Sequence, residues 1–433
     1  MYFCKRYLCD MKKSSFGVKK YIIILVVFAI GQITVFGQSS KKDTPKRKAV
    51  FIIVDGISAD QLKKAQTPYL DTISQIGNYT DAYVGGGAGT YSETPTISAV
   101  GYNSLLTGTW ANKHNVWGNA IKDPNYNYPS IFSLFKDQYP LGTTGIFSSW
   151  LDNRTKLAGE KLAETNNLNI DFTFDGLEHD SINFPHDKKR NFMKLIDYSV
   201  ADHAAKTIKE NAPDLSWVYL EFPDDMGHAF GDSPRFDAAI QFEDQLIGKI
   251  WEAITLREKQ FNEEWLLIIT TDHGRNAKNG KGHGGQTPRE RSTWIVLNQK
   301  NTNEYFNAHT PGIVDIMPTI ADFMHINIAE HVRREMDGTS LFNPVDAVNL
   351  KAKLNHENIE LSWHNLASEG TGVKVFISET NNFKSGKPDD YKQVAEVSCD
   401  QEFISIPLKT PQSKFYKIVL ETPNQSLNTW ILN

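Results

Sequence analysis

The chain has 433 residues, of which 40% are hydrophobic and 22% charged, a composition typical of globular proteins. Its formal net charge is −5, and residues 1–37 contain six Lys or Arg against one Asp, so the remainder would carry −10. This acidic balance argues against a binder of nucleic-acid polymers, which needs a basic surface. A small phosphorylated substrate held by metal ions is compatible with it.

The first 37 residues have the pattern of a secretory signal peptide. Four lysines precede an apolar run at 21–30, which fades just before Gln38. A membrane anchor is the alternative, but the run is short for a span, so we expect no stable membrane span after cleavage. The protein is therefore predicted to be exported to the periplasm, the cell surface or the medium. Cys399 is the only cysteine after residue 37, which excludes an internal disulfide in the exported chain.

Residues 48–347 alternate apolar strand patterns with amphipathic helix patterns, after a polar linker predicted at 38–47. Continuous apolar runs, typical of strands buried on both faces, occur at 49–54, 145–147, 217–222, 265–270 and 293–297. Helices are expected at 192–208 and from a Ser233 cap through Trp251. The alternation predicts an α/β fold, a three-layer α/β/α sandwich with a mainly parallel sheet.

Residues 165–190 are polar and aromatic and have no clear periodicity. We interpret them as a loop excursion that covers the active site and helps to select the substrate. A disordered insert is the alternative interpretation.

Residues 351–433 have a different pattern, with short alternating strands and no helix between them. The strands are expected at 359–363, 373–377, 403–406 and 415–420. They predict a small C-terminal β-sandwich that resembles a fibronectin type III module, with Trp363 and Tyr416 on its inner faces. We favour a packing role for this module over the binding of a glycan or protein.

Acidic and histidine side chains follow three of the predicted strands, and a further histidine lies in a glycine-rich loop. In chain order they are Asp55, Asp224, His228, Asp272, His273 and His283. Because ligands gather at the carboxyl ends of parallel strands, we expect these side chains to lie close together. Carboxylates and imidazoles are the ligands of catalytic zinc, although manganese or iron could use the same set.

Ser98 is the candidate nucleophile. A proline-containing stretch at 92–97 runs into a short predicted helix, and Ser98 stands at its first turn. A hydroxyl there lies in the positive end of the helix dipole, beside unpaired N–H groups that suit an anion. A helix cap would explain Ser98 on its own, but its combination with the acidic and histidine residues favours catalysis.

Over residues 48–345 these motifs resemble the alkaline phosphatase superfamily, especially its type I phosphodiesterase/nucleotide pyrophosphatase branch. The family's Asp-Gly after its first strand is matched at Asp55, and its Ser or Thr nucleophile, nine positions before Thr-Gly, at Ser98. Its Pro-Asp-x-x-Gly-His motif is matched at 223–228, which selects Asp224 over Asp225 as the ligand. Its Asp-His-Gly and closing His-Gly begin at Asp272 and His283.

The resemblance implies two zinc ions and a phosphoseryl intermediate. One zinc would be held by Asp224, His228 and His283, and the other by Asp55, Asp272 and His273, with Ser98 as a further ligand. Two metals clamp the attacking and leaving oxygens in such sites. Asn119, 21 residues after Ser98, matches the Asn that donates a hydrogen bond to a phosphoryl oxygen in pyrophosphatase-like members.

The predicted function is therefore an exported two-zinc phosphoester hydrolase of the phosphodiesterase/nucleotide pyrophosphatase type. An alkaline phosphatase-type phosphomonoesterase is the first alternative, because the nucleophile is Ser where the pyrophosphatase branch usually has Thr. Arg154 and Lys156 could then bind the phosphate. The Cys-x-Pro-x-Arg motif of sulfatases is absent. The second alternative, a non-catalytic surface-binding protein, would be favoured by a missing ligand, and none is missing.

Overall fold

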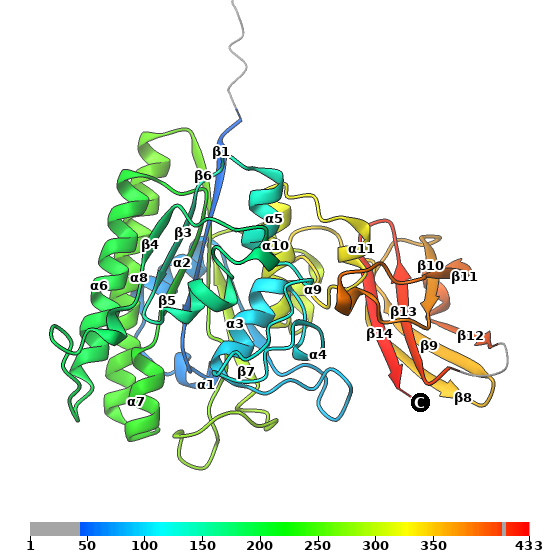
Figure 1. Cartoon of the computed structure of the whole chain (residues 1–433), viewed down its shortest axis with the longest axis horizontal. Coiled ribbons are helices and arrows are strands. Elements are labelled where there is room, and N and C mark those ends of the chain that lie inside the picture. Colours follow the sequence, from blue (N-terminus) through cyan, green and yellow to red (C-terminus); the bar gives the residue numbers. More distant parts are fainter. Residues whose placement is uncertain (1–43, 409–412, 433) are drawn as a thin grey trace, which may run out of the picture. The chain divides into compact units, whose positions relative to one another are not determined.

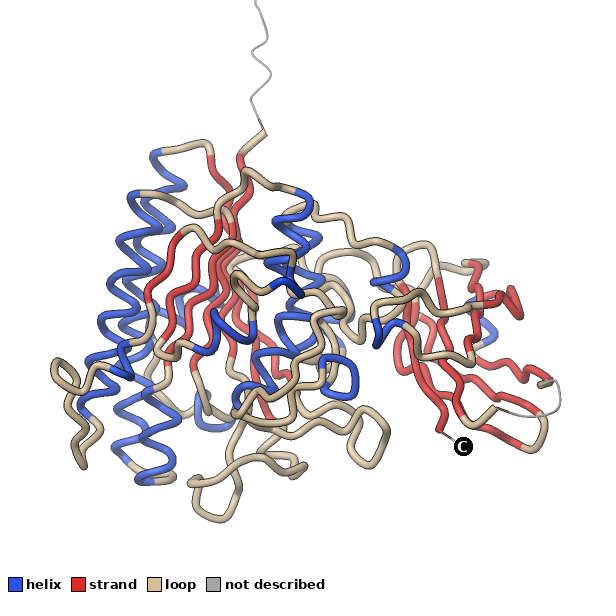
Figure 2. Tube along the Cα trace, viewed as in Figure 1, coloured by secondary structure: helices blue, strands red, loops and turns tan. Residues whose placement is uncertain are grey.

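A seven-stranded sheet forms the centre of the α/β part, in the order β2-β7-β6-β1-β5-β3-β4 (Figures 1 and 2). The strands are β1 (Lys46–Val54), β2 (Asn78–Tyr83), β3 (Thr144–Ser148), β4 (Phe172–Phe174), β5 (Leu215–Leu220), β6 (Glu263–Thr270) and β7 (Ser292–Leu297). β1 is parallel to both of its neighbours, β5 and β6, and β3 and β4 continue the parallel run. Only β7 pairs antiparallel with both neighbours. The predicted mainly parallel sheet is confirmed.

The computed structural model describes residues 44–408 and 413–432. The predicted signal peptide and most of the predicted linker lie outside this range and stay predictions, but β1 begins at Lys46, so the last two residues of the predicted linker belong to a strand. Among the described residues, no helix has the length and apolarity that crossing a bilayer requires.

Helices cover both faces of the sheet and complete three layers. In Figure 1, α6 and α8 lie on one face, and α3, α5 and α10 on the other. The helices are α1 (Ala59–Leu62), α2 (Pro68–Ile76), α3 (Ser98–Thr107), α4 (Ala111–His114), α5 (Ile131–Gln138), α6 (Asn191–Glu210), α7 (Phe222–Phe230), α8 (Pro234–Gln260), α9 (Glu304–Ala308), α10 (Ile316–Phe323) and α11 (Glu330–Arg333). β1 contributes side chains to both hydrophobic cores of the α/β part. Phe51 and Ile53 lie in one core, and Val50 and Ile52 lie in the other. This explains its unbroken apolar sequence.

Two elements of the sheet were not predicted. β4 lies inside residues 165–190, so this segment is a loop excursion that also supplies an edge strand, and a disordered insert is wrong for it. Three residues are too few for a period-two pattern to be visible. β2 is the other edge strand and is only partly buried, so its sequence lacks a long apolar run.

Two antiparallel sheets form the C-terminal part, in the orders β11-β10-β13-β14 and β12-β9-β8. Their strands are β8 (Ala347–Asn355), β9 (Asn358–Asn365), β10 (Gly372–Ser378), β11 (Lys392–Ser398), β12 (Phe403–Pro407), β13 (Phe415–Glu421) and β14 (Ser426–Leu432). Trp363 and Tyr416 are buried in the core between them, as predicted. The small β-domain is confirmed, whereas the likeness to fibronectin type III and the exact domain boundaries stay predictions.

Buried lysines connect the β-domain to the α/β part. Lys113 of α4 lies 2.6 Å from an Asp337 carboxylate oxygen and 2.7 Å from the Asn428 side-chain oxygen on β14. Lys417 of β13 lies 2.8 Å from the Glu335 carboxylate. Removing one member of such a buried pair destabilises the fold, because it leaves an uncompensated buried charge. These contacts are compatible with the packing role that we favour for the β-domain.

Candidate active site

Three of the predicted ligands meet beside the start of α7; Asp224, His228 and His283 are called the first group below. Asp224 and His228 are one helical turn apart, and Asp224 Oδ2 lies 3.1 Å from His228 Nε2. The loop after β6 brings His283 Nε2 to 3.1 Å from His228 Nε2. One ligand atom of each residue lies within 4.8 Å of the others, an arrangement that could hold one metal ion.

The other three ligands, Asp55, Asp272 and His273, are called the second group and lie at the ends of β1 and β6. His273 Nε2 is 3.3 Å from Asp55 Oδ1 and 3.3 Å from Asp272 Oδ2. Asp224 of the first group lies close to Asp55 and His273, so the two groups adjoin. All six predicted ligands are therefore brought together at one edge of the sheet.

The buried carboxylates of the second group fit a cation. Asp55 Oδ1 and Asp272 Oδ2 are buried, and neither has a hydrogen-bond partner among the residues that the structure describes. Buried carboxylate oxygens are costly unless a charge or a hydrogen bond compensates them. A divalent ion would compensate both oxygens, so the donor set fits the predicted metals.

Burial sets the protonation of these groups in the metal-free chain. It raises the pKa of Asp55 to about 6, with help from the charge of Asp224, and raises the pKa of Asp272 well above its usual value. Burial also lowers the pKa values of His273 and His283 to about 4 each. The two imidazoles are thus neutral at pH 7, the form that binds a metal, while ion binding would displace carboxyl protons.

Ser98 opens α3 beside the second group. The helix begins at Ser98, and the Ser98 Oγ lies 3.4 Å from His273 Nε2. Asn119 Oδ1 accepts a hydrogen bond of 3.0 Å from the Ala99 backbone N–H, which holds the Asn119 side chain against the same helix start. The predicted nucleophile Ser98, the predicted donor to the phosphoryl oxygen, Asn119, and the predicted ligand His273 therefore lie around the same helix start.

Arg154 and Lys156, the predicted phosphate-binding pair, are engaged elsewhere. Both lie in a π-helical turn, Asn153–Leu157. Arg154 Nε is 2.6 Å from Asp175, and the same guanidinium pairs with Glu160. Lys156 Nζ is 2.7 Å from Asp152. Within the described part of the chain, neither cation contacts Ser98 or the ligands, and their role stays a prediction.

Comparison with known proteins identifies the chain. A family model described as "Type I phosphodiesterase / nucleotide pyrophosphatase" matches residues 49–369, which is more than half of the chain. The chain belongs to this family. Membership confirms the resemblance inferred from the motifs, and with it the prediction of a phosphoester-hydrolase family. The match extends past residue 347 and covers β8 and β9, ending in the loop after β9.

Curated relatives are distant and longer than the chain. GPI ethanolamine phosphate transferase 2 of Saccharomyces cerevisiae is 23% identical over 304 residues, covering 65% of this chain and 34% of the relative. Human ectonucleotide pyrophosphatase/phosphodiesterase family member 5 is 25% identical over 245 residues, covering 53% of this chain and 45% of the relative. The chain thus spans less than half the length of these relatives.

One solved structure with which the chain aligns is also a distant one. Murine ectonucleotide pyrophosphatase/phosphodiesterase 5, solved as an inactive variant with AMP, aligns with a TM-score of 0.47 and 14% identity. The alignment covers 66% of this chain and 96% of that structure.

Two tyrosines that the motif analysis did not include hold the candidate ligand Asp55 by hydrogen bonds. Tyr219 OH donates a hydrogen bond of 2.7 Å to Asp55 Oδ2, and Tyr102 OH donates to the same oxygen. They leave Oδ1 of Asp55 to face His273. Tyr102 could have been found by its spacing, one helical turn after Ser98, whereas nothing in the β5 sequence distinguishes Tyr219.

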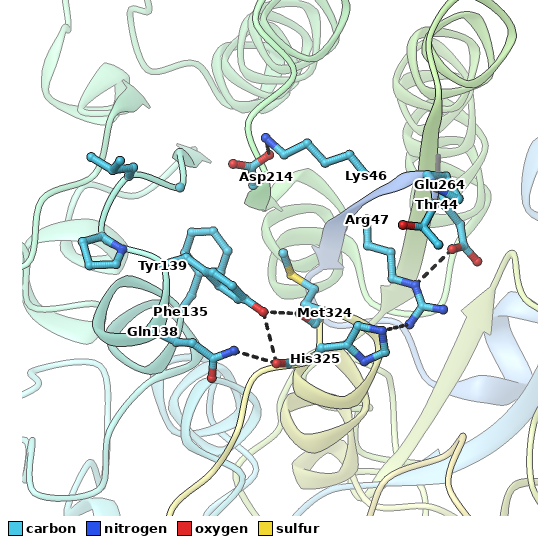
Figure 3. A pocket seen from close by; sticks show the side chains of 14 residues that line it. Thr44, Lys46, Arg47, Phe135, Gln138, Tyr139, Asp214, Glu264, Met324 and His325 are labelled. Carbon is cyan, nitrogen blue, oxygen red and sulfur yellow. Dashed lines mark hydrogen bonds and ion pairs between the residues drawn. The ribbon is translucent and has the colours of Figure 1, made fainter. Parts of the chain in front are cut away.

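A large cavity lies away from this site. It has a volume of about 710 Å³ and is lined by residues at the amino ends of β1 and β6 and by Tyr139 and His325 (Figure 3). None of the candidate site residues lines it. The carboxyl ends of the strands, not this cavity, carry the chemistry expected of the family.

A buried acid pair supports the start of α7, which carries two ligands of the first group. Asp197 accepts hydrogen bonds from the backbone N–H groups of Glu221, at 2.9 Å, and Phe222, at 2.6 Å. Glu243 of α8 is buried against Asp197. Burial raises the pKa of Asp197 to about 7 and the pKa of Glu243 well above its usual value. The pair therefore holds a proton near neutral pH.

From the raised pKa values of this pair we expect the free energy of unfolding to fall as the pH rises. Both pKa values are raised on folding, so the stabilisation is complete in acid and is lost as the pH rises through 7. We expect the free energy of unfolding to fall by on the order of 2 kcal/mol between about pH 5.5 and 8.5, measured by urea unfolding of the zinc-loaded protein. Glu243→Gln, whose side chain does not titrate, should flatten this slope, whereas Glu252→Gln, on an exposed position of α8, should not. An unchanged slope in Glu243→Gln would refute the assignment.

Close packing at Gly101 predicts that a side chain at this position lowers activity. A Cβ at this position of α3 would lie 2.7 Å from the Asp272 backbone oxygen and 3.0 Å from the Asp272 Cβ. Gly101→Ala should therefore push α3 and Ser98 away from the second group, lowering kcat by about 10- to 100-fold without unfolding the chain. Steady-state hydrolysis measures kcat, and circular dichroism measures whether the variant stays folded. Gly118→Ala, which meets nothing within 4 Å, is the control, and equal kcat values for the two variants would contradict the prediction.

Proposed function

We propose that this chain is an exported two-metal phosphoester hydrolase that cleaves phosphodiesters or phosphoanhydrides through a covalent intermediate on Ser98. The observation that carries the proposal is the position of the Ser98 hydroxyl. It lies at the first turn of α3, 3.4 Å from His273 Nε2. The same Nε2 is 3.3 Å from Asp55 Oδ1 and Asp272 Oδ2, two buried oxygens without a hydrogen bond in the described part of the chain. Helix starts favour anions, and paired metal sites favour in-line displacement at phosphorus.

The first group would hold one zinc ion and the second group, with Ser98, the other. When bound, the two ions would supply Lewis-acid chemistry, favouring the Ser98 alkoxide and balancing the charge of the leaving oxygen. Manganese or iron could occupy the same ligands.

The residues of the chain define the two chemical steps. The Ser98 Oγ gives up its proton and attacks phosphorus, an Oγ–phosphorus bond forms, and the bond to the leaving oxygen breaks as that oxygen takes up a proton. Asn119 Oδ1 is held by the Ala99 N–H, which leaves its Nδ2 to donate to a non-bridging phosphoryl oxygen. Water then cleaves the serine–phosphorus bond, and Ser98 recovers its proton.

Charge near the nucleophile favours a diester over a monoester. A monoester dianion carries one more negative charge and gains from an added cation. Arg154 is instead neutralised by Asp175 and Glu160, and Lys156 by Asp152. The serine nucleophile remains the feature that favours the monoesterase alternative.

Paired hydrolysis tests the proposal. Zinc-loaded protein should hydrolyse bis-p-nitrophenyl phosphate with a kcat/KM about tenfold or more above that for p-nitrophenyl phosphate. A preference for the monoester would favour the phosphomonoesterase and make Arg154 and Lys156 the next positions to replace. Hydrolysis of neither ester, with both ions bound, would contradict the proposed function.

A further inference from the structure

Arg275 is a buried cation that contacts a single candidate ligand. It lies in the loop after β6, its side chain is fully buried, and its Nη1 is 2.5 Å from Asp224 Oδ1. Its other N–H groups donate to backbone oxygens, to Gly280 through Nε and to Lys281 through Nη2 at 3.3 Å. The guanidinium therefore joins Asp224 of α7 to the loop that carries His283.

The space around this guanidinium depends on two glycines. A Cβ at Gly227 would lie 2.3 Å from the Arg275 Cζ, and a Cβ at Gly56 would lie 2.6 Å from Nη1. An arginine stays protonated throughout the working pH range, and a buried charge needs a charged partner. Asp224 is that partner, so this ion pair is a permanent part of the site.

The ion pair gives the two ligand groups different charges. The first group has one carboxylate, Asp224, whose charge Arg275 offsets. The second group has two, and their partners in the described part of the chain include tyrosine hydroxyls on Asp55 and the Gly56 backbone N–H on Asp272, but no lysine or arginine. Once the ion has displaced the carboxyl protons, it would therefore meet almost no net ligand charge in the first group and two negative charges in the second.

We propose that Arg275 makes the two metal positions unequal, so that the second group binds a divalent ion tightly and the first group binds one that exchanges readily. Arg275 also pairs with Asp224 Oδ1, so Oδ2, which lies 3.1 Å from His228 Nε2, is the oxygen that would be left to bind an ion. This inference rests on the proposed two-metal function. Arg275 acts through Asp224 and is a positioning residue.

Calorimetric titration of Zn²⁺ into the metal-free full chain, with a competing chelator, tests the order of binding. The wild type should show two events whose Kd values differ by about tenfold or more. His228→Ala should abolish the weaker event alone, and Asp272→Asn should weaken the tighter one. If His228→Ala abolishes the tighter event instead, the inference is wrong, and this result does not depend on any change at Arg275.

Variants at Arg275 test whether the charge of this residue makes the two metal affinities unequal. Arg275→Gln keeps an N–H donor for Asp224 but removes the charge, so it should tighten the weaker event by about tenfold and leave the tighter event unchanged. Arg275→Lys keeps the charge and should keep the two events separate. Equal affinities in the wild type, or a weaker event unchanged in Arg275→Gln, would overturn the inference alone. Binding of fewer than two ions by the wild type would overturn the two-metal function itself.

Discussion

Replacing Ser98 by alanine is expected to lower kcat for diester hydrolysis by about 10⁴-fold or more. The variant loses the oxygen that forms the covalent intermediate, so only uncatalysed attack by water within the site remains. Metal content and the binding of a product analogue should change little, because the six other ligands stay in place. Stopped-flow and long-time-course hydrolysis of bis-p-nitrophenyl phosphate measure the loss.

Two variants of α3 make this result specific. Ser98→Thr keeps the hydroxyl and should retain measurable turnover. Ser104→Ala removes a buried hydroxyl that bonds the Val100 carbonyl and His114, so it reports general damage to the helix. A loss of less than tenfold in Ser98→Ala, or an equal loss in Ser104→Ala, would contradict the role of Ser98.

Replacing Asp272 by asparagine is expected to lower kcat/KM by about 10³-fold and to remove tightly bound metal. Asparagine preserves the shape of the side chain and can still accept the Gly56 N–H, at 3.2 Å from Asp272 Oδ1, but it carries no charge for a divalent ion. A Lewis acid contributes several kcal/mol to such a transition state, and each 1.36 kcal/mol is tenfold in rate.

Metal analysis after gel filtration measures the loss of bound metal in Asp272→Asn, and steady-state kinetics measure the loss of kcat/KM. Asp81→Asn, at a surface ion pair with Lys63, is the matched control and should retain both metal and activity. Full metal content and normal turnover in Asp272→Asn would show that the second group does not bind the ion that catalysis needs.

That the candidate ligands lie close together was predictable, because each of them is marked by its position in the sequence. Asp55 and Asp272 follow long apolar runs, and parallel strands bring such ends to one edge of a sheet. His228 stands one helical turn after Asp224, a spacing that puts both on one side of α7. The strands buried on both faces were predictable for the same reason, because burial leaves a continuous apolar pattern.

The supporting contacts were not predictable, because they join residues far apart in the chain. Glu243 and Asp197 lie on helices whose sequence gives no sign that two carboxyl groups share a buried space. In the sequence, nothing distinguishes Arg275 from an exposed loop arginine. Its burial depends on Gly227 and Asp224, which are far from it in the chain and pack against it in the fold. A short edge strand such as β4 likewise takes its conformation from its pairing with β3.

The stereochemical course at phosphorus is the most direct test of a covalent intermediate. The experiment is hydrolysis of a chiral phosphorothioate diester in ¹⁸O-labelled water by the zinc-loaded protein, with analysis of the product configuration. Two successive in-line displacements, first by Ser98 and then by water, predict net retention of configuration. Net inversion would mean that water attacks the substrate directly, and would contradict the proposed role of Ser98.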